Sequence, residues 1–256
     1  MDDASLHKAL SAFSPITLEE MEAVKLMNRV DTKFVASLSQ LEAVLRLAQH
    51  DYYAQEIDGK RITHYDTLYY DTPDLAMYTR HHDQRMVRQK VRIRTYLDSD
   101  GLTFLEIKNK NNKGKTKKKR ITVSDQQALS HPTDEVSEFM TKRCWYDWPE
   151  LLPELRTDFS RITLVNKAKT ERLTIDLHLV WSNLQTGIDK TYANLVIIEL
   201  KRDGNSPSPM LGIMQTLRIK PMKISKYCIG TALTNDAVKR NRFKAKIRKI
   251  EKITAP

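Results

Sequence analysis

The sequence predicts a single α+β domain in which antiparallel strands form a β-barrel flanked by helices. Two observations lead to this fold class. Many segments alternate apolar and charged residues with a period of two, which is the pattern of strands that bury one face. Neither an internal repeat nor a linker divides the 256 residues, and a few segments of helical spacing separate the strands. We therefore expect one domain over 1–256, with a core over about 28–233.

The strands are expected where the alternation of apolar residues is clearest. The turn Asp98-Ser99-Asp100-Gly101 separates two such runs and predicts a hairpin. The stretch 109–119 has Asn, Gly and many Lys but no apolar residue, so it is interpreted as a mobile hairpin tip. In chain order the expected strands cover residues 28–37, 61–70, 87–96, 102–108, 120–123, 159–167, 172–180, 194–201 and 223–230.

The helices are expected where apolar residues recur at helical spacing or where a start signal precedes them. Ser39 and Glu42 have the spacing of a capping box. The sequence Asp71-Thr72-Pro73 predicts a turn into a short helix, and Ser208-Pro209 predicts the start of another. The expected helices cover residues 1–26 (an N-terminal helical segment broken near Pro15), 39–50, 75–82, 124–143, 208–220 and about 236–252, the last being a basic C-terminal helix.

The composition points to an anionic partner and away from several enzyme classes. The formal net charge is +11, which favours binding of nucleic acid, an acidic membrane surface or a polyanionic small molecule. Seven glycines are few, and no G-x-G-x-x-G or G-K-[ST] string is present, so a Rossmann or P-loop enzyme is not expected. Cys144 and Cys228 match no zinc spacing. The acidic first residues and the absence of a membrane-spanning apolar run predict a soluble cytoplasmic protein.

Cations occupy one face of most expected strands. Arg92 and Arg94 face one way and Val91 and Ile93 the other. The same alternation sets other charged residues apart from apolar neighbours: Arg29, Asp31, Lys33, Glu106, Lys108, Arg172, Asp176, Glu199 and Lys201. A solvated sheet face normally mixes small polar residues with both signs of charge, whereas stacked like charges destabilise a sheet unless an anion offsets them. In a barrel with its apolar face outward, these cations would line a lumen that holds a polyphosphate or nucleoside triphosphate.

Seven short motifs in order resemble a known family over residues 28–233. They are Arg29-Val-Asp-Thr-Lys33-Phe, Tyr70-Asp-Thr-Pro73, Val91-Arg-Ile-Arg94-Thr-Tyr96, Leu105-Glu-Ile-Lys108, Arg172-Leu-Thr-Ile-Asp176, Ile198-Glu-Leu-Lys201 and Ile224-Ser-Lys226-Tyr227. This set resembles the VTC domain, the polyphosphate polymerase domain of the vacuolar transporter chaperone complex and its bacterial relatives. The VTC domain belongs to the triphosphate tunnel metalloenzyme superfamily.

The resemblance implies a fold, a reaction and a set of site residues. The fold is a tunnel of antiparallel strands whose walls bind phosphates. The reaction transfers the terminal phosphoryl group of ATP to a growing polyphosphate chain with a divalent metal, Mn²⁺ or Mg²⁺. Arg92, Arg94 and Lys226 are expected to be catalytic, and Glu199 is the expected metal ligand. The expected phosphate-binding residues are Arg29, Lys33, Lys108, Arg120, Arg161, Arg172 and Lys201.

The roles of several individual residues are expected on more specific grounds. Arg29 stands where tunnel hydrolases and cyclases have the first carboxylate of a Glu-x-Glu-x-Lys strand, a replacement that removes a metal ligand and adds a phosphate ligand. Arg120 is preferred over Lys119 because alternation places it on the face of Lys118. Asp176 is expected to pair with Arg172 or Arg92 rather than to bind metal. Arg85, Arg88 and Lys90 have two interpretations, a position near a tunnel mouth or a solvated surface, and the solvated surface is preferred.

Three functions other than polymerisation are consistent with the residues. One is a non-catalytic module that binds polyphosphate or nucleotide, and a second is an inorganic triphosphatase. Sequence-independent nucleic-acid binding by the basic segments Lys110–Lys119 and Lys239–Lys249 ranks last, because no aromatic residue interrupts Lys110–Lys119 and no recognition motif is present. The charge of these segments is also consistent with guiding a polyphosphate chain out of the tunnel or with attraction to an acidic membrane leaflet. We therefore expect ATP and polyphosphate as partners and no specific nucleic acid. A membrane-protein partner, which would hold the cytoplasmic protein at a membrane, is a further expectation.

Overall fold

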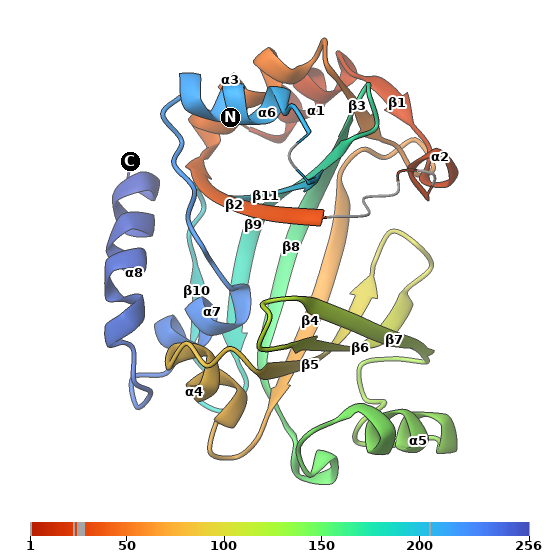
Figure 1. The fold of residues 1–256 in the computed structure, drawn as a ribbon, viewed down its shortest axis with the longest axis vertical. Coiled ribbons are helices and arrows are strands. Elements are labelled where there is room, and N and C mark those ends of the chain that lie inside the picture. The colour runs from red at the N-terminus through yellow and green to blue at the C-terminus, as the bar shows by residue number, and fades with distance from the viewer. Residues whose placement is uncertain (1, 23, 25–28, 205, 256) are drawn as a thin grey trace.

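A curled, eleven-stranded sheet dominates the computed structural model, which describes residues 2–22, 24, 29–204 and 206–255 (Figure 1). Asn28, where the first long strand was expected to begin, lies outside these residues. The strands are β1 (Ser14–Ile16), β2 (Arg29–Ser37), β3 (Tyr52–Gln55), β4 (Thr63–Asp71), β5 (Arg88–Tyr96), β6 (Leu102–Lys110), β7 (Thr116–Val123), β8 (Leu152–Asn166), β9 (Glu171–Asn183), β10 (Asp189–Thr191) and β11 (Leu195–Asp203).

The order of the strands explains how the sheet forms a tunnel wall. The main path runs β2-β11-β9-β8-β4-β5-β6-β7, and every pair along it is antiparallel. The short β1 pairs in parallel with β3. Within the described residues no ladder joins β7 to β2, so the predicted barrel is a curled sheet with its two ends unjoined. Strands β2 and β7, the two ends of this path, lie on opposite sides of the curl in Figure 1.

Helices cover the convex side of the curl and one of its ends (Figure 1). The apolar residues of α1, α3 and α6 pack on β8, β9 and β11, and those of α5 pack on β5 and β6. A third apolar cluster joins α4, α7 and α8 to β4, β8 and β9. No helix in the described part of the chain is both long and apolar enough to cross a membrane. The helices are α1 (Asp3–Ser11), α2 (Leu18–Glu22), α3 (Leu38–Ala48), α4 (Ala76–His82), α5 (Asp134–Arg143), α6 (Pro209–Thr216), α7 (Lys226–Thr234) and α8 (Asn241–Thr254), with a 3₁₀ turn at Trp148–Glu150.

Most of the segment expected as a strand over 223–230 is instead helical, because helix α7 begins at Lys226. Ser225 caps the helix, and its side chain accepts a hydrogen bond from the backbone N–H of Cys228 at 3.3 Å. The aromatic and branched residues that suggested a strand are buried against the sheet in the helix as well. Local propensity was therefore overridden by tertiary packing.

Several element boundaries also differ from those expected. The capping box is formed by Ser37 and Gln40, not by Ser39 and Glu42, because Ser37 is the last residue with extended backbone. Helix α5 begins only after its cap at Thr133, so residues 124–133 form turns and irregular backbone. The N-terminal segment contains the short strand β1 between its two helices. The C-terminal helix begins at Asn241, five residues later than predicted.

A glycine allows α7 to pack closely within the curl of the sheet. A Cβ atom at Gly230 would lie 2.3 Å from the Trp181 ring and 2.6 Å from Leu155. We expect Gly230→Ala to lower the free energy of unfolding by about 1–3 kcal/mol, because the helix must move away from the sheet. Thermal or denaturant unfolding measures this change. The matched control is Gly212→Ala in α6, where no atom lies within 4 Å and the change should stabilise by up to about 1 kcal/mol. Equal effects of the two substitutions would contradict the packing argument.

Candidate anion-binding site

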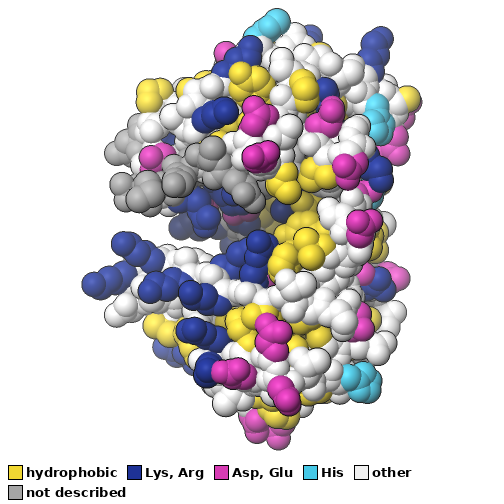
Figure 2. All heavy atoms as spheres, turned by 90° about the vertical axis from the view of Figure 1, so that its right-hand side faces the viewer, with side chains coloured by type: hydrophobic (Ala, Val, Ile, Leu, Met, Phe, Trp, Pro, Cys, Tyr) yellow, Lys and Arg dark blue, Asp and Glu magenta, His cyan; other side chains and the backbone are white. Residues whose placement is uncertain are grey.

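The concave face of the sheet gathers cations from strands that are far apart in the sequence. Strand register places Lys33 opposite Glu199, Arg161 opposite Asp176, and Arg92 opposite Glu106. Figure 2 looks into the hollow and shows Lys and Arg side chains on both of its walls. Of the predicted site residues, this face holds Lys33, Arg92, Arg94, Lys108, Arg161, Arg172, Glu199 and Lys201.

Arg92 is fixed by a carboxylate and a phenol. Its Nε donates to Glu106 at 2.7 Å, and its Nη1 donates to the hydroxyl of Tyr69 at 3.3 Å. Lys118 donates to the other oxygen of Glu106 at 2.9 Å. Burial would lower the pKa of Arg92, but Tyr69 and Glu106 outweigh it and raise the pKa above its ordinary value. The guanidinium therefore stays charged and its orientation is defined.

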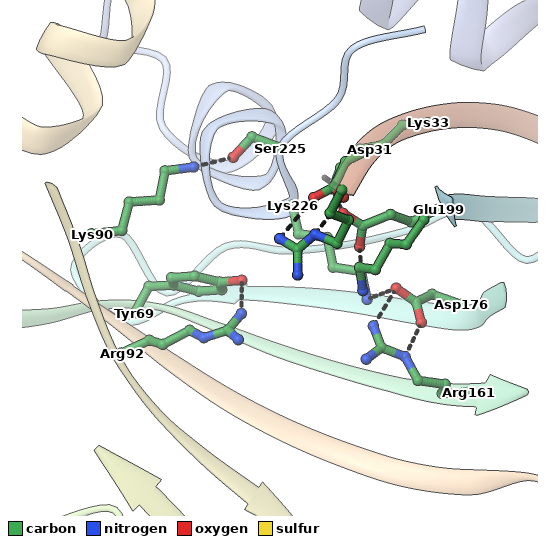
Figure 3. Close-up of polar contacts among 12 residues, drawn as sticks. Asp31, Lys33, Tyr69, Lys90, Arg92, Arg161, Asp176, Glu199, Ser225 and Lys226 are labelled. Atoms are coloured by element: carbon green, nitrogen blue, oxygen red, sulfur yellow. Dashed lines mark hydrogen bonds and ion pairs between the residues drawn. The ribbon is translucent and has the colours of Figure 1, made fainter. Parts of the chain in front are cut away.

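Asp176 joins a strand cation to a helix cation (Figure 3). Arg161 donates to both of its oxygens, at 2.6 and 2.9 Å, and the Lys226 Nζ lies 2.7 Å from Oδ2. Burial would raise the pKa of Asp176, but Arg161 and Lys226 hold it well below its usual range. The expected pairing of Asp176 with Arg172 or Arg92 is wrong, because Arg161 lies directly opposite it and α7 brings Lys226 to it.

Glu199 has the loosest ion pairs of the carboxylates on this face. Its two oxygens lie 3.6 Å from the Lys33 Nζ and 3.4 Å from the Lys201 Nζ. Burial would raise the pKa of Glu199, but Lys201 and Lys33 hold it well below its ordinary value. No group of three or more His, Cys, Asp or Glu able to hold a metal ion is found among the described residues. Mg²⁺-like ions commonly use one or two carboxylates plus substrate phosphates, so this ionised, weakly held carboxylate fits such an ion.

Arg94 is a buried cation without a carboxylate partner. Its side chain is 6% exposed, its Nε donates to Thr67 Oγ1 at 2.9 Å, and its guanidinium lies 5.4 Å from the centre of the Tyr65 ring. No Asp or Glu in the described ranges forms an ion pair with it. Burial, together with repulsion from Arg92 and Arg161, lowers the pKa of Arg94 to about 10. A buried charge of this kind is costly unless an anion joins it.

Lys108 and Arg172 likewise form no ion pair with a carboxylate in the part of the chain that the structure describes. Repulsion from Arg92 and burial hold the pKa of Lys108 well below its usual range. Burial, with repulsion from Arg29 and Arg161, lowers the pKa of Arg172, and its buried Nε has no hydrogen-bond partner. The hollow therefore contains more positive charge than its carboxylates neutralise, and a polyanion would restore the balance.

Two of the predicted residues lie at the rim instead of in the hollow. Arg29, on the edge strand β2, pairs with Asp31 at 2.7 Å and has 45% of its side chain exposed. Arg120, on the edge strand β7, lies over the Phe104 ring at 4.1 Å and is exposed. Alternation correctly placed both on the concave side of their strands, but it contains no information on which strands form the edges of the sheet.

Three residues of the hollow were missed as site candidates. Tyr69 is buried and stacks on Tyr227 with 5.3 Å between ring centres. Lys118 shares Glu106 with Arg92. Lys90, expected to be a solvated surface residue, is half-buried and donates to the Ser225 hydroxyl at 2.7 Å (Figure 3). The sequence pattern could have identified Lys90, because it is two residues from Arg92 on β5 and its side chain therefore points to the same face.

Comparison with solved structures shows the fold. The chain is similar to a candidate adenylyl cyclase from Hippeastrum described as having a dominant triphosphatase activity, with 14% identity over 80% of this chain and 96% of that one and a TM-score of 0.50. It is also similar to a candidate adenylate cyclase from Bacillus halodurans, with 18% identity over 78% and 96% of the two chains and a TM-score of 0.48. The likeness to the Hippeastrum protein confirms the predicted α+β fold with an antiparallel sheet of tunnel type.

Sequence comparison supplies the family. No curated protein sequence matches the chain. The family model described as the VTC domain matches residues 28–235, close to the predicted core of 28–233. This match covers most of the chain. It includes all the described strands on the main path of the sheet, from β2 to β7. The chain therefore belongs to the VTC domain family.

Proposed function

We propose that this protein is a polyphosphate polymerase that transfers the terminal phosphoryl group of ATP to a growing polyphosphate chain. The single observation that carries the proposal is Arg94, a buried guanidinium that has two cationic neighbours and no ion pair with a carboxylate among the described residues. Membership of the VTC domain family supports phosphate-chain chemistry in this hollow. Glu106, Asp176 and Glu199 pair with some of these cations, and a highly charged anion would neutralise the others.

The positions of the cations suggest a division of roles. Phosphoryl transfer needs alignment of the reacting groups and neutralisation of charge more than it needs a protein nucleophile. Arg92, Arg94 and Lys226 converge from β5 and α7 on the space in front of Tyr69 and Phe159, and are proposed to hold the phosphoryl group that is transferred. The remaining proposed phosphate-binding residues are Lys33, Lys108, Arg161, Arg172 and Lys201 in the hollow and Arg29 and Arg120 at its rim.

The carboxylates keep these cations in place before substrate arrives. Glu106 orients Arg92, and Asp176 orients Arg161 and Lys226, so little reorganisation is needed when the phosphates bind. The forked guanidinium groups can each bind two phosphate oxygens, whereas Lys226 acts as a compact charge. Glu199 is the proposed ligand of a divalent ion, Mn²⁺ or Mg²⁺, which would supply charge neutralisation at the phosphates when bound.

The proposal is tested by incubating the purified protein with ATP and Mn²⁺ or Mg²⁺ and resolving the products by length on a gel. We expect long-chain polyphosphate as the product. We expect Arg92→Ala and Lys226→Ala to abolish it, because each variant lacks one of the positive side chains proposed to hold the transferred phosphoryl group. Thermal unfolding of each variant checks that it remains folded. The matched control is Lys117→Ala, an exposed cation opposite Asn109 on the convex face of β7, which should leave the product unchanged.

Two further measurements, orthophosphate release and polyphosphate binding, distinguish the other two candidate functions. Release of orthophosphate from tripolyphosphate without chain growth would identify an inorganic triphosphatase. Tight binding of polyphosphate without consumption of ATP by the folded protein, with either metal, would identify a binding module and would overturn the polymerase proposal.

A further inference from the structure

A second group of cations continues the concave face beyond Arg92 toward α4 and α8. We call it the mouth cluster, and it consists of Arg88, Lys90, Lys110, Lys223 and Lys246. These residues come from β5, β6, the segment before α7, and α8. Arg88, Lys90, Lys110 and Lys246 are half-buried, and Lys223 is exposed.

The register of β5 and β6 places like charges directly opposite one another in this region. Arg88 is opposite Lys110 and Lys90 is opposite Lys108, whereas the next pair inward is Arg92 with Glu106. Like charges at opposed positions destabilise a sheet. Across the described part of the chain, no Asp or Glu forms an ion pair with any member of the mouth cluster. The compensation that operates in the centre of the hollow is therefore missing here.

Electrostatic coupling connects the mouth cluster to the centre of the hollow. Burial and the charges of Lys33 and Arg88 lower the pKa of Lys90. Lys90 is therefore repelled both by a cation of the hollow, Lys33, and by a cation of the mouth cluster, Arg88. Burial, with repulsion from Arg88 and Lys223, lowers the pKa of Lys110. Burial and Lys223 likewise lower the pKa of Lys246. Cations that repel one another thus extend from the hollow to helix α8.

His81 of α4 also lies close enough to the mouth cluster to be affected by its positive charge. Its ring lies 6.4 Å from that of Phe243, over which the Lys246 ammonium lies at 5.7 Å. The buried Nδ1 of His81 has no hydrogen-bond partner. Burial, with repulsion from Lys90, Arg88, Lys246 and Lys110, lowers the pKa of His81 to about 2. The histidine is therefore neutral, and it adds no charge that could compensate the cluster.

We propose that the mouth cluster binds the part of a polyphosphate chain that extends beyond the reacting phosphates, so that affinity rises with chain length. This inference rests on the proposed function, because it takes the hollow to hold the reacting end. Successive concave-face cations on β5, from Arg88 to Arg94, are spaced about 7 Å apart and so form a row of about 20 Å. A triphosphate in the centre reaches only part of this row, whereas a flexible chain of repeated charges follows all of it.

The occupant is argued to be a phosphate chain rather than a nucleic acid or an acidic peptide. The row lies on the concave face and continues directly from the cations of the hollow, so a thin, unbranched polyanion fits it. Phe243, the ring over which the Lys246 ammonium lies, is buried in the packing of α8 and offers no exposed face on which a base could stack.

The test compares affinities for two ligands by titration calorimetry at constant ionic strength, without nucleotide. The ligands are tripolyphosphate and a polyphosphate of about one hundred phosphates. The first variant is Arg88→Gln with Lys110→Gln, and the second is Lys223→Gln with Lys246→Gln. We expect each variant to lower the ratio of long-chain to tripolyphosphate affinity at least fivefold. The control is Lys113→Gln with Lys115→Gln, two exposed lysines of the β6–β7 turn, which should keep the wild-type ratio.

The outcomes separate this inference from the proposed function. A ratio that stays at the wild-type value in both variants, or that falls equally in the control, overturns the mouth cluster as a chain-binding section. Equal losses for both ligands also overturn it, because they indicate only a general positive field. If the wild-type protein makes no polymer but its affinity ratio still depends on Arg88 and Lys110, the polymerase proposal fails and the chain-binding section stands. If neither ligand binds the wild-type protein, both are overturned.

Discussion

Replacing Arg94 with Met is expected to stabilise the ligand-free protein while weakening tripolyphosphate binding about 100-fold. The guanidinium is buried beside Arg92 and Arg161, and no carboxylate of the described residues forms an ion pair with it, so its removal relieves desolvation and repulsion. Replacing buried charges by apolar side chains of similar volume is often neutral or stabilising by about 1–4 kcal/mol. A 100-fold loss of affinity corresponds to about 2.7 kcal/mol, within the range for removal of a buried charged contact. Thermal unfolding and calorimetric titration measure the two effects.

The same substitution at Arg161 is the matched control. Arg161 donates to both oxygens of Asp176, so Arg161→Met should weaken tripolyphosphate binding and also lower stability. Loss of one partner from a buried ion pair costs up to about 3–5 kcal/mol, and less where a second cation such as Lys226 remains. If Arg94→Met destabilises the ligand-free protein as much as Arg161→Met does, Arg94 is compensated within the fold, and the observation that carries the proposed function is lost.

Replacing Asp71 with Ala is expected to lower the free energy of unfolding by at least about 3 kcal/mol and to abolish activity. The carboxylate is fully buried and accepts hydrogen bonds from the backbone of Thr72, Met77 and Tyr78 and from the hydroxyl of Tyr227. Each buried donor left without a partner costs about 1–3 kcal/mol. Denaturant unfolding measures the loss of stability, and the polymerisation assay measures the loss of activity.

The effect on activity follows from the position of Tyr227. It is next to Lys226 on α7 and stacks on Tyr69, which accepts a hydrogen bond from Arg92. Asp71 therefore acts as a positioning residue for two proposed catalytic cations. Tyr227→Phe is the control, because it removes one hydrogen bond and keeps the aromatic stack. It should cost about 1.5–3 kcal/mol and leave much of the activity. An Asp71→Ala protein as stable as Tyr227→Phe would contradict this role.

The sequence predicted which cations share a face because alternation along a strand is a local property. Successive side chains point to opposite faces whatever the partner strand is, so Arg92 and Arg94 had to share a face, and Lys108 had to lie on the face of Glu106. The same rule should have included Lys90, which was instead assigned to solvent. The apolar residues between these cations pack against helices, as expected of a sheet with one polar face.

The sequence alone determined that positive charge would gather on one side of the β-strands, because the two-residue period of the pleat needs no knowledge of neighbours. Only the tertiary structure decided which cations are compensated, since the pairing of Asp176 with Arg161 and Lys226 depends on strand register and on helix packing. It also decided that residues 226–234 form a helix, through the contact of Gly230 with Trp181. Ion pairs and close packing join residues distant in the chain, and no local pattern specifies them.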